Sequence, residues 1–288
     1  MASSENSGAP RASVLIRTLN EGRTLGAVLD AVLAQIPPPA EVLVLDSGST
    51  DGTREAAAAR APRVRFEALE GRFTFGRALN EGTRRLGAEV VAYLSGHAAP
   101  RGDGWLAALL RPLADARVGA VYGRQVPWPD CPPWEARAIE RTYGDVARLQ
   151  RDDPRFSNAN AAVRRAAWRS HPFDEDLPGA EDLRFAMDLQ AAGMLVAYAP
   201  DAAVFHSHAE TLGEVLRRAE REARAERSLG RWRWPGIVPA LAGAAAHAWR
   251  DERWILARHG LRPLWMVQAP LVQFAKVRGR RRAAGDAR

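Results

Sequence analysis

The sequence predicts an α/β fold, with a mixed, Rossmann-like sheet that has helices on both faces and a helical region at the C-terminal end. Three observations carry this prediction. Short apolar runs suited to buried strands alternate with amphipathic helical segments. Several of these runs end in turns rich in Gly, Ser, Asn and Asp. Residues 230–288 lack strand runs and read as helices.

The first two strands and the helix between them form a βαβ unit. Residues 13–18 (SVLIRT) are an apolar run that Asn20-Glu21-Gly22 breaks before an amphipathic helix. Residues 41–45 alternate too little for a half-buried strand and suit a parallel strand covered on both faces. Asp46 then stands at the carboxyl end of that strand, where open α/β sheets bind ligands. An ordinary βα turn with a capping Asp is the alternative interpretation of this segment.

The alternation continues along the chain. The expected elements are a helix at 51–60, a strand at 63–68, a helix at 76–86, strands at 90–94 and 118–125, a helix at 134–149, a polar strand at 156–168, a helix from 181 and a strand at 195–198. The Pro- and Trp-rich segment 126–135 disfavours both a helix and a central strand. We therefore place a boundary there.

Composition narrows the class of protein. With 288 residues and 47% hydrophobic content, the chain can form one large domain with an appendage. A single cysteine, Cys131, excludes an internal disulfide and fits a reducing compartment. Residues 1–12 have no signal-peptide pattern and are expected to be a disordered leader. No apolar run reaches the roughly 20 residues that a membrane-spanning helix needs.

The basic charge is concentrated in the tail. Residues 211–288 contain 17 Lys+Arg and 7 Asp+Glu, a net +10, whereas residues 1–210 carry a net −3. Five of the nine tryptophans also lie there. Trp and Arg on amphipathic helices suit contact with anionic lipid, and a helical packing layer or homodimer surface fits equally well. Nucleic acid is not an expected partner, because the body is acidic and no reading motif is present.

Several motifs in the same order resemble family 2 glycosyltransferases with the GT-A fold. RTLNEG (17–22) and LDSGSTDGT (45–53) are similar to the family's "PTxNE" and "VDDGSTDGT". FSNANAAVRR (156–165) is similar to "xSNxNxAxRR", and FDE with GAED (173–182) is similar to "FDE…GxED". The resemblance covers about residues 13–225. It implies a GT-A domain at 13–229, with a nucleotide-binding half at 13–125, an acceptor half at 126–229 and a helical appendage at 230–288.

The resemblance implies roles for particular residues. Asp182 would be the general base of an inverting sugar transfer, with Glu181 beside it. One carboxylate suffices because it removes the acceptor proton while the diphosphate leaves as a stabilised anion. The nucleotide would be held by Arg17, Thr18, Asn20, Glu21, Asp46, Gly76 and Arg77. The donor and acceptor pocket would contain Arg124, Asn158, Asn160 and His206.

The expected cofactor is a divalent metal, Mn²⁺ or Mg²⁺, and here the sequence departs from the family. His97 stands where relatives place an aspartate that binds the metal. Imidazole suits Mn²⁺ and softer ions better than Mg²⁺. His206 and His208, two residues apart, could share one cation with His97, and His208 is the expected second ligand. Alternatively, arginines such as Arg77 or Arg124 meet the diphosphate charge. Leu79 stands where many relatives have an arginine.

We therefore expect a cytoplasmic hexosyltransferase, peripheral at the inner face of the membrane if the tail binds lipid. Its donor would be a UDP-, GDP- or dTDP-sugar and its acceptor a saccharide or lipid-linked saccharide. The motif VYGRQVP and the FDE and GAED motifs resemble those of rhamnosyltransferases, which favours rhamnosyl transfer. Two alternatives remain. One is a non-catalytic nucleotide-sugar-binding homologue; the other is a nucleotidyltransferase, whose usual glycine- and basic-rich loop is missing after the first strand.

Overall fold

The computed structural model describes residues 11–208 and 210–285, and the chain divides into two compact units. The first unit comprises Met1–Gln125, Gly144–Glu175 and Asp182–His206. The second comprises Val126–Tyr143, Asp176–Glu181 and Ser207–Arg288. The expected leader at 1–12 lies almost entirely outside the described residues.

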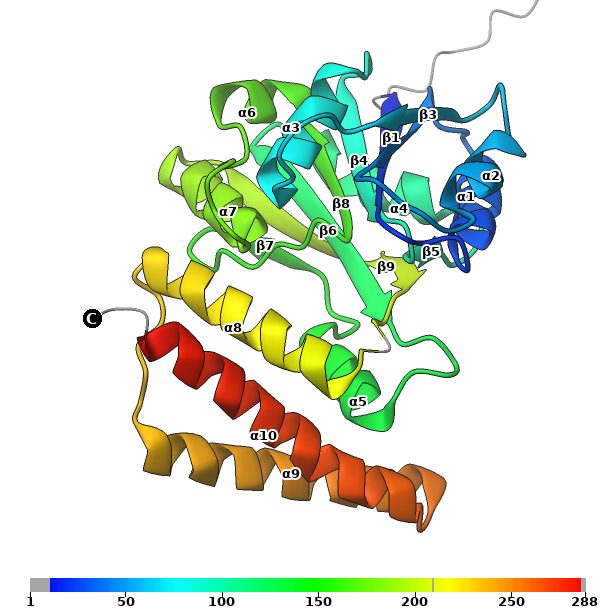
Figure 1. The fold of residues 1–288 in the computed structure, drawn as a ribbon. Coiled ribbons are helices and arrows are strands. Elements are labelled where there is room, and N and C mark those ends of the chain that lie inside the picture. Colours follow the sequence, from blue (N-terminus) through cyan, green and yellow to red (C-terminus); the bar gives the residue numbers. More distant parts are fainter. Residues whose placement is uncertain (1–10, 209, 286–288) are drawn as a thin grey trace, which may run out of the picture. The chain divides into compact units, whose positions relative to one another are not determined.

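The first unit is built on one mixed β-sheet (Figure 1). Its strands in the described residues are β1 (Ala12–Thr18), β2 (Val42–Asp46), β3 (Arg65–Ala68), β4 (Val90–Ser95), β5 (Ala99–Pro100), β6 (Val118–Val126), β7 (Arg148–Gln150), β8 (Asn160–Arg164) and β9 (Leu195–Phe205). They are ordered β3-β2-β1-β4-β8-β6-β9-β5, and β7 pairs with β9. The predicted mixed α/β sheet is confirmed.

The central strands are covered on both faces. Successive side chains of a strand point to opposite faces, and every residue of β2 and all but one of β1 are buried. β2 and β4 both run parallel to β1, with Thr18 opposite Asp46 and Arg17 opposite Ser95. β8 runs antiparallel to β4 and to β6. The carboxyl ends of β1, β2 and β4 therefore meet at one edge of the sheet.

Helices of the first unit connect and cover these strands. They are α1 (Leu25–Leu33), α2 (Thr53–Ala58), α3 (Phe75–Arg84), α4 (Trp105–Leu110), the 3-10 helix η1 (Arg111–Ala114), α6 (Arg165–Ser170) and α7 (Glu181–Ala191). α1 buries Leu25, Val28, Leu29 and Val32, which share one face because they are spaced three and four apart. Gly82 of α3 lies so close to the Leu15 side chain that an added Cβ would come within 2.3 Å of it.

Two expected elements are wrong in part. The helix expected at 134–149 ends at Thr142, because residues 148–150 form β7 and pair with Val196, Ala197 and Tyr198 of β9. The strand expected at 156–168 is confined to 160–164, and α6 begins at Arg165. The Arg165 guanidinium donates hydrogen bonds to the carbonyls of Thr83, Leu86 and Ala88, which stabilises this start.

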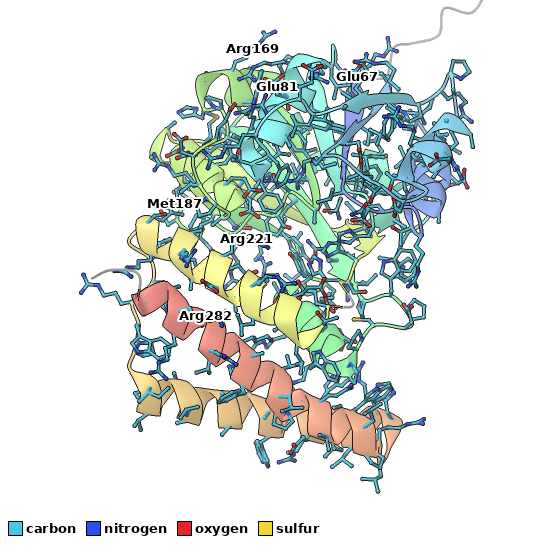
Figure 2. All side chains as sticks on the ribbon, viewed as in Figure 1. Glu67, Glu81, Arg169, Met187, Arg221 and Arg282 are labelled. Atoms are coloured by element: carbon cyan, nitrogen blue, oxygen red, sulfur yellow. The ribbon has the colours of Figure 1, made fainter. Side chains whose placement is uncertain are left out.

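The second unit is helical in its described residues. Its helices are α5 (Pro133–Thr142), α8 (Leu212–Ser228), α9 (Ile237–His259) and α10 (Pro263–Gly285). α8 begins with a capping box, in which Thr211 and Glu214 each bond the other's backbone amide. α10 crosses α8 closely at Gly279, where an added Cβ would lie 2.3 Å from the Leu216 carbonyl oxygen. Figure 2 labels Arg221 on α8 and Arg282 on α10.

No helix within residues 11–208 and 210–285 combines the length and the apolar character that crossing a membrane requires.

Candidate active site

Polar loops follow β1 and β2 at the common edge of the sheet, and the two loops are tied together. The Asn20 amide N–H donates to Ser49 Oγ at 2.7 Å, and the Thr50 N–H donates to Asn20 Oδ1 at 2.9 Å. The Glu21 N–H donates to Thr53 Oγ1 at 2.8 Å. Side chains of one loop thus satisfy backbone groups of the other, and the edge is fixed before any ligand binds.

Asp46 organises the loop that follows it. Its side chain is 4% exposed and accepts hydrogen bonds from Thr18 Oγ1, from the Gly48 and Ser49 amides and from Ser49 Oγ. Gly48 has φ of +100°, a conformation that favours glycine. Both carboxylate oxygens are therefore engaged within the turn. Direct contact of Asp46 with a nucleoside stays a prediction.

The remaining predicted nucleotide-binding residues lie around α3 and β1. The Arg17 guanidinium carbon lies 5.7 Å from the centre of the Phe75 ring. Arg77 donates to the carbonyls of Glu70 and Arg72 at 2.6 and 2.7 Å and so holds the loop before α3. Gly76 packs on the Asp174 backbone, since an added Cβ would lie 2.1 Å from that carbonyl oxygen. These contacts give Arg77 and Gly76 structural roles, and their nucleotide contacts stay predictions.

A carboxylate–histidine pair lies between the loops after β1 and β4. Glu21 Oε1 is 2.6 Å from His97 Nδ1, and each side chain is about one-fifth exposed. A neutral imidazole that donates through Nδ1 has its lone pair on Nε2, the usual arrangement when a carboxylate orients a metal-binding histidine. Gly96 permits the approach, because an added Cβ would come within 2.8 Å of the Thr18 and Glu21 side chains.

His97 also stacks on His206, which follows β9. The ring centres are 4.8 Å apart and the planes differ by 18°. One ring nitrogen of His97 lies within 4.8 Å of a ring nitrogen of His206. A ring nitrogen of His208, two residues further along the chain, is within the same distance of His206. Both histidines lie beyond β9, which ends at Phe205. His206 is buried, whereas His208 is exposed. Neutral imidazoles at this spacing can hold a borderline divalent cation.

The asparagines before and within β8 are buried. Asn160 is 0% exposed; its amide donates to the carbonyls of Arg124 and Ala202 and accepts from Trp105 Nε1 at 2.9 Å. These contacts fix the strand end, and the pocket role of Asn160 stays a prediction. Asn158 is 2% exposed. The Arg124 Nε atom is buried without a hydrogen-bond partner among the described residues, so this guanidinium is a candidate to meet an anion.

The predicted catalytic carboxylates lie at the start of α7. Glu181 is buried, and Asp182 is half-buried and accepts a hydrogen bond from the Leu183 amide at 2.8 Å. The helix begins where the sequence predicted it.

Sequence reasoning did not foresee the pairing of Glu21 with His97. The residues are 76 positions apart, and only their common place at strand ends could have indicated contact.

Parallel strands that end in polar loops, with helices on both faces of the sheet, are typical of α/β proteins that bind their ligands at the carboxyl ends of the strands. The model of glycosyl transferase family 2 matches residues 13–174, and that of glycosyl transferase family group 2 matches residues 143–275. The chain belongs to glycosyl transferase family 2, and it is a glycosyltransferase that uses a nucleotide-sugar donor.

Named relatives agree with this assignment. The chain is 28% identical over 281 residues to the O-antigen chain rhamnosyltransferase RfbN of Salmonella typhimurium, covering 93% of this chain and 87% of that protein. It is 28% identical over 245 residues to the N-acetylglucosaminyl-diphospho-decaprenol L-rhamnosyltransferase of Mycobacterium tuberculosis, covering 69% and 77%.

A solved structure confirms the fold. The mannosyltransferase PcManGT from Pyrobaculum calidifontis, in complex with GDP-Man and Mn²⁺, superimposes with a TM-score of 0.66 at 23% identity, covering 98% of this chain and 89% of that one. The predicted GT-A fold is therefore present.

Proposed function

We propose that this protein transfers rhamnose, with inversion, from a nucleotide-activated rhamnose to a saccharide on a lipid diphosphate carrier. The observation that carries the proposal is the match over 93% of the chain to a protein named as an O-antigen chain rhamnosyltransferase. The mycobacterial relative named above acts, by its name, on a sugar joined to a prenyl diphosphate, which supports the acceptor class.

Asp182 is the proposed general base. Inversion in one displacement needs a carboxylate near the acceptor hydroxyl, which takes the proton as the oxygen attacks the anomeric carbon. Asp182 is half-buried on the first turn of α7, in the position that matches the last residue of GAED. Glu181 beside it is buried and would support the helix start.

A divalent cation is the proposed cofactor, and the donor set fits one. His97 and His206 would hold it with His208, and Glu21 would orient His97 through its 2.6 Å contact. The cation would neutralise charge on the leaving diphosphate. Because the set is rich in imidazole, Mn²⁺, Co²⁺ or Ni²⁺ should support activity better than Mg²⁺. Arg124 would face the same anionic groups.

The test uses purified protein with dTDP-, GDP- and UDP-sugars and a synthetic prenyl diphosphate saccharide. Turnover with an activated rhamnose and inversion at its anomeric carbon would support the proposal. Asp182→Asn should lower kcat by about 100-fold or more, since general base catalysis contributes 10²–10⁴-fold, while nucleotide affinity changes little. Asp188→Asn, which removes a carboxylate from the same helix, is the control. Equal turnover by Asp182→Asn and the wild type would exclude Asp182 as the base.

A non-catalytic nucleotide-sugar-binding homologue is the competing interpretation. It predicts donor binding by calorimetry without transfer or donor hydrolysis under any metal.

A further inference from the structure

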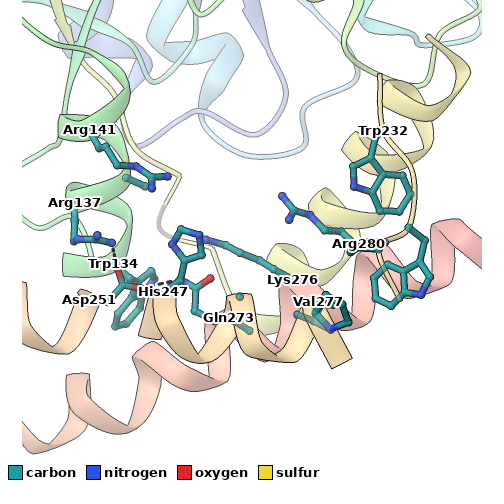
Figure 3. A pocket seen from close by; sticks show the side chains of 17 residues that line it. Trp134, Arg137, Arg141, Trp232, His247, Asp251, Gln273, Lys276, Val277 and Arg280 are labelled. Carbon is teal, nitrogen blue, oxygen red and sulfur yellow. Dashed lines mark hydrogen bonds and ion pairs between the residues drawn. The ribbon is translucent and has the colours of Figure 1, made fainter. Parts of the chain in front are cut away.

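The second unit contains a pocket of about 310 Å³ among α5, α9, α10 and the segment that leads from α8 into α9 (Figure 3). Each helix contributes a stripe of side chains spaced three or four residues apart, as Arg137 and Arg141 do on α5 and Lys276 and Arg280 do on α10. Trp232 and Trp234 line the pocket from the connecting segment. The pocket lies wholly within this unit.

The charges that line the pocket do not balance. Its one carboxylate, Asp251, is already bound by Arg137 Nη1 at 2.6 Å and by Gln273 Nε2 at 2.7 Å. By contrast, Arg141, Lys276 and Arg280 form no ion pair with any described residue. Three cations therefore line this pocket without a direct ion pair to the described part of the chain, although Asp251 and Glu222 lie near enough to Lys276, and Glu226 near enough to Arg280, to interact with them.

Lys276 shows the cost of this arrangement. Burial lowers its pKa and the nearby Arg218 and Arg280 lower it further, whereas Asp251 and Glu222 offset only part of this effect. Burial also lowers the pKa of His247, with Arg141 adding to the effect. Removing a cation from water without a partner is unfavourable, and an anion in the pocket would offset that cost.

One side of the pocket is apolar. The Trp232 and Trp234 rings are 6.3 Å apart, and Pro235 and Pro239 continue this side. The same helices expose large apolar side chains, among them Val238 on α9 and Leu264 and Val267 on α10, each more than 60% exposed. A ligand with an anionic head and an apolar chain matches both features.

We propose that this pocket binds a phosphate or diphosphate group carried on an apolar chain. Arg141, Lys276 and Arg280 would contact the phosphate oxygens, and the tryptophans would contact the start of the chain. The connection of this site to the acceptor rests on the proposed function. Phosphate binding itself is measured without sugar transfer, so the two proposals can fail separately.

The first experiment measures binding of inorganic pyrophosphate to the full-length protein by calorimetry. Lys276→Met keeps an unbranched side chain of similar length and removes its charge. We expect the affinity for pyrophosphate to fall by at least about 10-fold, because one charge-assisted contact is lost. Arg278→Met is the matched control, because Arg278 is on the same helix, is exposed and does not line the pocket. Pyrophosphate bound at the nucleotide site contributes equally to both variants.

Folding of the variant is checked by its melting temperature, which should not fall, because the substitution removes a desolvated charge. Arg280→Gln, at an exposed position, should weaken pyrophosphate in the same direction. Unchanged affinity in both pocket variants, or no binding by the wild type beyond one nucleotide-competitive site, would overturn the proposal.

The second experiment identifies the source of the phosphate. Geranyl diphosphate should bind more tightly than pyrophosphate, and Lys276→Met should remove that advantage. Equal affinity for the two would assign the site to free diphosphate and overturn the requirement for an apolar chain. A phospholipid head group would be the source under two conditions. The wild type, but not Lys276→Met, would sediment with phosphatidylglycerol vesicles, and geranyl diphosphate would bind no more tightly than pyrophosphate.

Discussion

Glu21→Gln tests whether the carboxylate orients His97 for a cation. The substitution keeps the shape of the side chain and removes the charge from a 2.6 Å contact. A hydrogen bond to a charged group contributes about 1.5–3 kcal/mol, and a neutral one about 1 kcal/mol. The expected loss is therefore about 0.5–2 kcal/mol, or roughly 2–30-fold in affinity. Because both side chains are about one-fifth exposed, we expect a value near 10-fold.

The assay is calorimetric titration of Mn²⁺ into the nucleotide-free protein, followed by kcat/KM at several Mn²⁺ concentrations. Activity lost at low Mn²⁺ should return at high Mn²⁺. Glu67→Gln is the control, because it removes one charge from the same unit at a surface carboxylate that pairs with Arg65 and Arg85 (Figure 2). It should change Mn²⁺ affinity less than about 2-fold. If Glu21→Gln bound Mn²⁺ as tightly as Glu67→Gln, the orienting role of Glu21 would be refuted.

Two further predictions concern buried polar groups. Asn160→Ala leaves Trp105 Nε1 and two carbonyls without their partner, so urea denaturation should show that the free energy of unfolding falls by about 3 kcal/mol or more. Ser157→Ala, the control, loses one hydrogen bond to Gln125 and should lower it by about 1 kcal/mol. Similar losses in the two variants would refute the bracing role of Asn160. Burial, with Glu135 nearby, raises the pKa of Cys131 to about 12, so iodoacetamide at pH 8 should modify the folded protein far more slowly than the urea-unfolded chain. Because the pKa is raised, its contribution to stability is present below the unfolded thiol pKa of about 8.5 and is lost as pH rises toward 12; equal alkylation rates in both states would contradict the burial.

The strands that form the site edge could be predicted because their signals are local. A run such as 41–45 is apolar throughout and ends in a Gly/Ser/Asp turn, and both features depend only on neighbouring residues. The end of α5 could not be predicted in the same way. Residues 148–150 become a strand because they pair with β9, nearly fifty positions further on, and no local pattern carries that information.

The motifs predicted which residues gather near the site but not which of them touch. Glu21, predicted to bind the nucleotide, contacts His97 in the structure, and its contact with a nucleotide stays a prediction. The motif also did not predict that Trp105, 55 positions earlier, donates to the side-chain oxygen of Asn160. The basic tail was recognised by its charge alone. Arg141, Lys276 and Arg280 line one pocket only because separate helices pack together, which composition does not encode.

β8 runs in the opposite direction to β4, so the chain reaches the site edge at the start of β8 and not at its end. Neighbouring parallel strands deliver their side chains to this edge as the chain leaves the sheet, whereas β8 brings its first residues there as the chain enters, with Asn160 opposite Leu94. The segment before β8 therefore reaches the site edge separately from the loops that follow β1 and β2. It is held there by its own contacts, because Phe156 is buried and Gln150 donates hydrogen bonds to the carbonyls of Asp153 and Arg155.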